Sequence, residues 1–175
     1  MKKKKKGISK KTVLIILFVI TTIVVSYSVS FLLKSSSLAK YKTDKISFLY
    51  DRSWSVSKLE DNIYLTKNNG SSITISVRSL DDETENMTVE EINSSVISKL
   101  MSENEEYKKI SDKAMKLTSV YYDGYKTLLE NNTSEALVFV VATNDNVLVV
   151  NYTAKNKYFD MSLDSVESIV GSILM

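Results

Sequence analysis

The sequence predicts an α+β fold: an N-terminal transmembrane helix, then an antiparallel β-sheet flanked by helices, an α/β/α sandwich. Three observations predict it. Residues 12–33 carry no charge and follow a lysine-rich start. Behind them, two blocks of strand pattern each precede a helical pattern. The last two predicted strands are apolar at nearly every position. A sheet with one wet face would alternate, so we expect a cover on both faces.

Residues 12–33 have the composition of a transmembrane signal anchor. A helix of these 22 residues is about 33 Å long, which exceeds the ~30 Å of a bilayer core. The polybasic segment 1–11 should remain in the cytoplasm and the rest should be extracytoplasmic, because basic residues favour the cytoplasmic side. Its lysines are also the expected contact with anionic membrane lipid; they are Lys2, Lys3, Lys4, Lys5, Lys6, Lys10 and Lys11.

Two alternatives to the anchor remain open. A signal peptide also begins with lysines, although its apolar region is usually shorter. Pairs of small residues that a signal peptidase could accept occur at Ser26/Ser28, Ser28/Ser30 and Ser37/Ala39. A buried helix of a soluble protein is the other alternative. Residues 34–44 are rich in Ser and Lys and predict a linker. Residues 45–175 are enough for one domain.

The first half of this domain predicts four strands and a helix. Residues 46–50 place Ile46, Phe48 and Tyr50 on one face of a strand, and strands at 55–59, 63–66 and 72–79 follow, with a turn sequence at 67–71. Thr88 and Glu91 have the spacing of a capping box, and apolar residues recur at helical intervals after them. We therefore expect a helix at about 88–103.

The second half predicts more strands and a closing helix. Weak strand patterns at 108–112, 115–121 and 125–129 precede a hairpin of 136–142 and 147–152, with its turn at 143–146. Ser162 is placed to cap a final helix whose apolar residues run from Leu163 to Ile173. This helix and the helix at 88–103 are the expected covers of the sheet.

Composition excludes several kinds of chemistry. The chain has no Cys and no His, which excludes disulfides, thiol nucleophiles, thiolate metal sites and Ser-His-Asp catalysis. From Asp44 onward there are 21 acidic and 13 basic residues, a net charge of about −8. A nucleic-acid-binding domain is expected to be basic instead. We therefore expect no nucleic-acid partner and no cofactor.

The segment 48–56, Phe-Leu-Tyr-Asp-Arg-Ser-Trp-Ser-Val, resembles the opening of the PsbP-like superfamily, an aromatic residue followed by x-Tyr-Pro-x-Gly-Trp-x-Val. Tyr50 and Trp54 match, whereas Asp51 replaces the Pro and Ser53 the Gly. The later order of elements agrees loosely over residues 45–175. The resemblance implies a PsbP-like domain of the membrane-attached bacterial DcrB type, a non-enzymatic α/β/α sandwich that binds protein partners or assists assembly.

Candidate site residues lie mainly between the predicted elements. We expect contact with a protein partner through an acidic loop and a tyrosine cluster; the residues are Asp81, Asp82, Glu83, Glu85, Tyr121, Tyr122 and Tyr125. A cation at the acidic loop is an alternative, although the loop lacks the order of a calcium loop. Trp54 is expected to be a core or sheet-edge anchor rather than an exposed contact.

These patterns together predict a single-pass protein at the bacterial cell surface, in the cell membrane, that binds a partner at the cell envelope or assists assembly without catalysis. A protein that binds a small ligand or a cation is the alternative. A hydrolase that uses carboxylates such as Glu103, Glu105 or Glu106 is a further one, although so small a domain leaves little room for a cleft. The oligomeric state and the partner stay open.

Overall fold

The computed structural model describes residues 19–21, 37–81, 84, 86–117 and 122–175. The chain divides into two compact units, Met1–Leu38 and Ala39–Met175. In the first unit, Val19 to Thr21 are helical. The rest of the expected transmembrane helix at 12–33, and the seven lysines before it, lie outside the described residues. Over the described ranges, no helix combines the length and the hydropathy needed to cross a bilayer.

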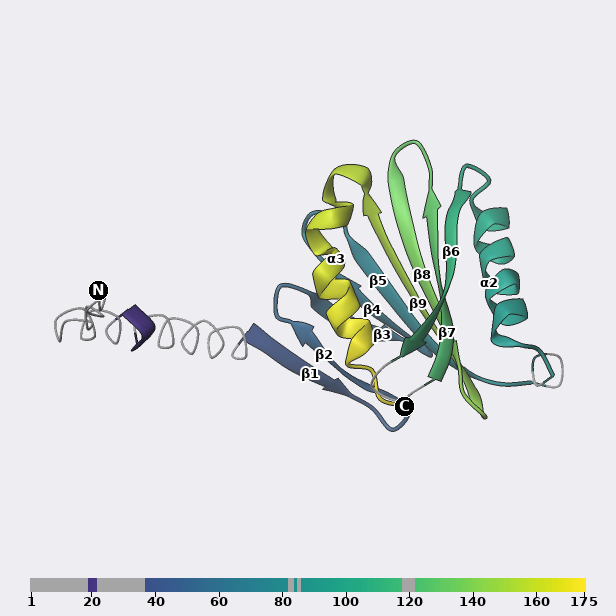
Figure 1. Ribbon diagram of the computed structural model, residues 1–175, viewed down its shortest axis with the longest axis horizontal. Helices are drawn as coiled ribbons and strands as arrows, with labels where there is room; N and C mark the ends of the chain where they lie inside the picture. Colours follow the sequence, from purple (N-terminus) through teal and green to yellow (C-terminus); the bar gives the residue numbers. More distant parts are fainter. Residues whose placement is uncertain (1–18, 22–36, 82–83, 85, 118–121) are drawn as a thin grey trace, which may run out of the picture. The chain divides into compact units, whose positions relative to one another are not determined.

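The second unit contains a seven-stranded antiparallel sheet in the order β3-β4-β5-β9-β8-β7-β6 (Figure 1). Two runs of consecutive strands build it, and they meet where β5 pairs with β9. The strands are β3 (Ser55–Leu59), β4 (Asn62–Thr66), β5 (Ser72–Ser79), β6 (Lys108–Leu117), β7 (Tyr122–Glu130), β8 (Ser134–Ala142) and β9 (Asn146–Lys155).

Helices lie on opposite faces of this sheet, α2 (Val89–Glu103) on one and α3 (Asn156–Gly171) on the other (Figure 1). Side chains of β8 alternate between two separate cores: Val138 and Val140 pack toward α2, whereas Phe139 and Val141 pack toward α3. The continuous apolar run of β8 follows from this arrangement, since each face needs its own buried side chains. The predicted double cover of the sheet is therefore confirmed.

The predicted helix at 88–103 is confirmed together with its cap. Thr88 Oγ1 accepts a hydrogen bond from Glu91 N at 3.3 Å, and Glu91 Oε2 accepts one from Thr88 N at 2.8 Å. The buried side chain of Asn93 then fixes α2 on the sheet, because its Nδ2 donates to the buried Thr127 and to the exposed Asp112, each at 3.2 Å. α2 packs mainly on β7 and β8. The same face of β5 and β9 is therefore left partly open.

The expected cap of the last helix is wrong. α3 begins at Asn156, directly after β9, and its N-cap is Lys155 without a side-chain hydrogen bond. Ser162 is a buried residue in the middle of the helix. The apolar periodicity after Ser162 is real, but Phe159 is also buried against the sheet. An aromatic residue one turn earlier thus extends the packed face toward the N-terminus.

Two further boundaries differ from expectation. Part of the expected linker at 34–44 forms β1 (Leu38–Lys42), which pairs with β2 (Ser47–Asp51) as a separate two-stranded sheet. Tyr41 stacks on Phe48 with ring centroids 5.1 Å apart, a contact that the polar composition of the segment conceals. Residues 108–117 of the strands expected at 108–112 and 115–121 form the single strand β6, whose register shifts between Lys109 and Ser111, and residues 118–121 lie outside the described residues. This irregularity interrupts the alternation that marks a continuous strand.

Candidate functional site

The acidic loop is described only in part. Asp81 and Thr84 form a local turn in which Asp81 N donates to Thr84 Oγ1 and Thr84 N donates to Asp81 Oδ1, each at 3.0 Å. Asp82, Glu83 and Glu85 lie outside the described residues, as does Tyr121. Within the described residues, no group of three acidic side chains converges on a point where a metal ion could bind.

The two described tyrosines of the predicted cluster do not form one patch. Tyr122 and Tyr125 are three residues apart on β7, so their side chains leave opposite faces of the sheet. Tyr122 packs against the core under α3. Tyr125 faces α2, where loss of hydration and then its interaction with Glu90 raise the pKa of its hydroxyl. Only Tyr125 is therefore on the face that the start of α2 covers.

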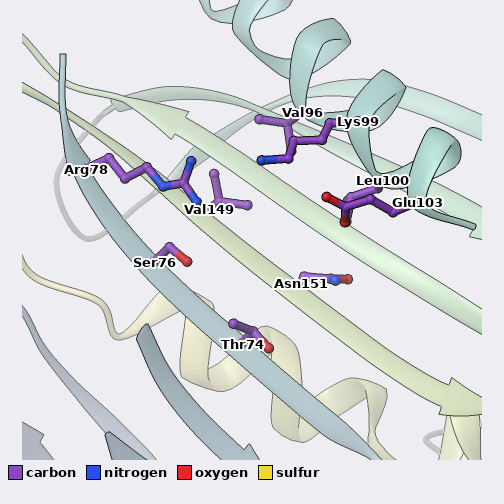
Figure 2. A pocket seen from close by; sticks show the side chains of 9 residues that line it. All are labelled: Thr74, Ser76, Arg78, Val96, Lys99, Leu100, Glu103, Val149 and Asn151. Atoms are coloured by element: carbon purple, nitrogen blue, oxygen red, sulfur yellow. The ribbon is translucent and has the colours of Figure 1, made fainter. Parts of the chain in front are cut away.

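A pocket of about 240 Å³ opens where α2 leaves β5 and β9 uncovered (Figure 2). β5 contributes every second residue to it, because successive strand side chains alternate between faces. α2 contributes residues three and four apart, which share one face of a helix. The lining residues are Thr74, Ser76, Arg78, Val96, Lys99, Leu100, Glu103, Val149 and Asn151.

Charges in this pocket are separated along its length. Figure 2 shows the charged ends of Arg78 and Lys99 toward one end, and the carboxylate of Glu103 and the amide of Asn151 toward the other. Half-buried Val96, Leu100 and Val149 lie among them. Among the described residues, no salt bridge involves Arg78, Lys99 or Glu103. The pocket thus offers two cations, one anion and an apolar surface to a ligand.

Asn151 adds an unmet hydrogen-bonding group at the acidic end. Its Oδ1 is covered from solvent and accepts no hydrogen bond from the described residues. An uncompensated buried acceptor costs about 1–3 kcal/mol. A half-turn of the amide exchanges Oδ1 with Nδ2, so this end of the pocket can present either an acceptor or a donor.

A second polar cluster lies beneath α3. Lys67 Nζ donates to Ser162 Oγ at 3.2 Å and lies 4.4 Å from the centroid of the Trp54 ring. Partial burial lowers the pKa of Lys67, and the charge of Asp51 opposes this shift. A lysine beside a serine can activate a nucleophile, but Ser162 is only 2% exposed. The contact therefore fixes α3 on the sheet and leaves no hydroxyl open to a substrate.

Trp54 belongs to the same structural cluster. Its side chain is 3% exposed, and its Nε1 donates to Ser165 Oγ of α3 at 2.9 Å. The expectation of a core or sheet-edge anchor is confirmed.

The sequence interpretation missed the pocket. The alternation of β5 does contain a signal, because Thr74, Ser76 and Arg78 share its polar face. Glu103 was considered only as a possible hydrolase carboxylate. What the sequence could not show is that α2 leaves the strands next to this polar face partly uncovered.

Comparisons with known proteins identify the fold. No protein-family model matches the chain, and a search of curated proteins gives no match. Among solved structures, the fold is similar to cyanobacterial PsbP (CyanoP) from Synechocystis sp. PCC 6803, with TM-score 0.63 and 11% identity over 79% of this chain and 92% of that one. It is also similar to LpqN of Mycobacterium tuberculosis, a protein involved in cell envelope biogenesis, with TM-score 0.53 and 12% identity over 78% of this chain and 88% of that one. The predicted resemblance to PsbP-like proteins is confirmed at the level of the fold.

Proposed function

We propose that this chain, whose described domain has a PsbP-like fold, is a single-pass membrane-anchored extracytoplasmic protein that binds a partner at the cell envelope or assists assembly, without catalysis. The fold supports this, since its solved neighbours include LpqN, which is involved in cell envelope biogenesis. The uncharged stretch at 12–33 and the lysines before it support the anchor and its orientation.

The observation that carries the non-catalytic part of the proposal is the placement of the polar groups. The Ser162–Lys67 contact lies under α3, and the Asn93–Thr127 contact is enclosed under α2, with the exposed Asp112 at its edge. Both serve to hold a helix on the sheet. The charged side chains of the open pocket instead form no salt bridges among the described residues, which is typical of binding rather than of a nucleophile with its base.

Tyr125 and the acidic loop are the proposed surface for a protein partner. The acidic segment 81–85 precedes α2 in the sequence, and Tyr125 interacts with Glu90 in the first turn of that helix. Tyrosine contributes strongly to protein interfaces, whereas an acidic rim mainly changes the association rate and its salt dependence. Tyr122 is left out of this surface because it packs on the opposite core.

The experiment places a photo-crosslinking amino acid at Tyr125 in the full chain in intact cells. The control carries it at Tyr158, a similarly half-buried tyrosine of α3 on the other face of the sheet. We expect a discrete crosslinked protein from position 125, weakened in the Glu90→Gln variant and at high salt, and none from position 158. The same product from both positions, or none from either, would contradict the proposed surface.

Orientation and catalysis are tested separately. Protease added outside spheroplasts should remove residues beyond 45 and leave the N-terminus intact. Protection of the C-terminal domain would overturn the orientation. Turnover of peptidoglycan, polysaccharide or ester substrates by the purified protein, abolished by Glu103→Gln in a folded variant, would show an enzyme instead.

The pocket between α2 and β5 supports a second candidate, a protein that binds a small ligand. It is concave, carries unpaired charges within the described residues and has an apolar floor. Ligand sites commonly combine these features. The two candidates are compatible, because the pocket and the Tyr125 surface do not share a side chain.

A further inference from the structure

We propose that the pocket between α2 and the β5–β9 pair binds a small zwitterion of dipeptide length, with its carboxylate toward Arg78 and its ammonium toward Glu103. This inference rests on the proposed binding function and adds the chemistry of the ligand.

The cationic end selects a carboxylate. Arg78 is the last pocket residue of β5, and Lys99 extends from α2 toward the same end (Figure 2). Both side chains are exposed, and no acidic residue forms a salt bridge with either in the described part of the chain. The guanidinium group matches the two oxygens of a carboxylate, and the ammonium of Lys99 adds a second donor.

The opposite end selects an ammonium group. Glu103 contributes a carboxylate without a salt bridge among the described residues, and a half-turn of the Asn151 amide brings its oxygen, which lacks a donor, toward the ligand. A purely anionic ligand, such as a phosphate, would meet repulsion from Glu103 at this end. A ligand with opposite charges at its two ends satisfies Arg78 and Glu103 together.

The spacing is too long for a single amino acid. Asn151 pairs in register with Thr74, four residues from Arg78 on β5, which is about 13 Å along the strand. The long side chain of Arg78 shortens this gap. Two extended residues span about 7 Å, whereas a free amino acid holds its charges within a single residue, about half that distance.

Volume and surface favour short aliphatic side chains. The 240 Å³ of the pocket hold about eight waters at roughly 30 Å³ each. That accommodates a dipeptide main chain with aliphatic side chains no longer than leucine over Val96, Leu100 and Val149, but not a long acyl chain. Because the pocket is open to solvent and its charges are exposed, we expect weak binding. For a ligand of this size, the expected dissociation constant is at most about 1 mM.

The experiment titrates alanyl-leucine into the full-length protein in a non-ionic detergent and measures heat by calorimetry. We expect saturable binding. N-acetyl-alanyl-leucine, which lacks the ammonium, and alanyl-leucine amide, which lacks the carboxylate, should bind more weakly. Free leucine should also bind more weakly, because its charges are too close together.

Variants assign the two ends. Arg78→Gln and Glu103→Gln should each weaken alanyl-leucine binding by about fivefold, the size expected for one exposed charge pair. Lys58→Gln and Glu105→Gln, exposed residues outside the pocket, should leave it unchanged. Circular dichroism establishes that each variant is folded.

Absence of saturable binding up to about 10 mM, tenfold above the expected constant, would overturn the inference. So would equal binding of all four ligands, or binding that depends on Arg78 alone, which indicates a simple anion site. Loss of dipeptide binding with the crosslink from Tyr125 retained refutes only this inference. Loss of the crosslink with dipeptide binding retained refutes the protein-partner proposal instead.

Discussion

Replacing Val138 with Asp tests the two-sided core directly. Val138 lies fully buried on β8 and packs toward α2. Val150 on β9 is equally buried but packs toward α3. Its chain neighbour Val149 is half-buried at the pocket. Val138→Asp and Val150→Asp therefore probe one face of the sheet each. Val149→Asp is the matched control for Val150→Asp, because it makes the same substitution at the neighbouring position of β9.

The cost of the buried aspartate has three parts. Loss of the buried valine surface costs about 2 kcal/mol. Holding the new carboxyl group neutral at pH 7, about three units above its ordinary pKa of roughly 3.9, costs about 4 kcal/mol. An unpaired neutral carboxyl group costs about 1–3 kcal/mol more. The total of about 8 kcal/mol is comparable to the whole stability of a typical domain, about 5–15 kcal/mol.

Urea unfolding followed by circular dichroism at two pH values provides the assay. At pH 7, Val138→Asp and Val150→Asp should be largely unfolded, whereas Val149→Asp should keep a measurable transition. Burial raises the folded pKa of each new carboxyl group above its unfolded value. The stability that each variant retains while this carboxyl group is neutral in both states is therefore fully present below about pH 3.9 and is lost as the pH rises. Relative to the parent protein, both variants should recover about 4 kcal/mol between pH 7 and pH 4.

A wild-type urea midpoint for Val138→Asp at pH 7 would refute the buried position on the α2 face. Val149→Asp as damaging as Val150→Asp would show that α2 covers β9 completely. The pocket described above would then be closed.

Two further predictions concern the cap of α2 and the first strand. Hydrogen bonds from Thr88 lower the pKa of Glu91 below 4.5, so the stability that Glu91 contributes is present above pH 4.5 and is lost as the pH falls through the folded pKa. The urea midpoint should therefore fall less between pH 6 and pH 3 in Glu91→Gln than in the parent protein. An equal fall in both proteins would contradict the cap. The free energy of unfolding of a fragment of residues 37–175 should exceed that of a fragment of 44–175 by about 0.5–1.5 kcal/mol or more, because the longer fragment keeps the stack of Tyr41 on Phe48. Equal thermal midpoints of the two fragments would show that β1 adds no stability.

Local sequence was sufficient to predict an element wherever the residue pattern of that element alone specifies its structure. The strands β3 and β5 lie where alternation places them, and the reciprocal hydrogen bonds of Thr88 and Glu91 form within a single turn. The apolar run of β8 even predicted a second cover, since a strand cannot expose those side chains to water on either face. These features depend on neighbours that are close along the chain.

Contacts between different elements decided the rest. β1 forms because Tyr41 stacks on Phe48 of β2, and α3 begins early because Phe159 of α3 stacks on Tyr152 of β9. The tyrosines of β7 were expected to act together, yet their spacing of three places Tyr122 and Tyr125 on opposite faces once the strand is in register.

The candidate pocket has the same origin. The sequence by itself determined the sheet with two helical covers, the acidic domain and the charged start of the chain. Only the tertiary structure decided that α2 lies over β7 and β8 and leaves β5 and β9 partly open. The physical reason is that a helix's own periodicity specifies its apolar face, whereas the strands it covers depend on packing between segments far apart along the chain.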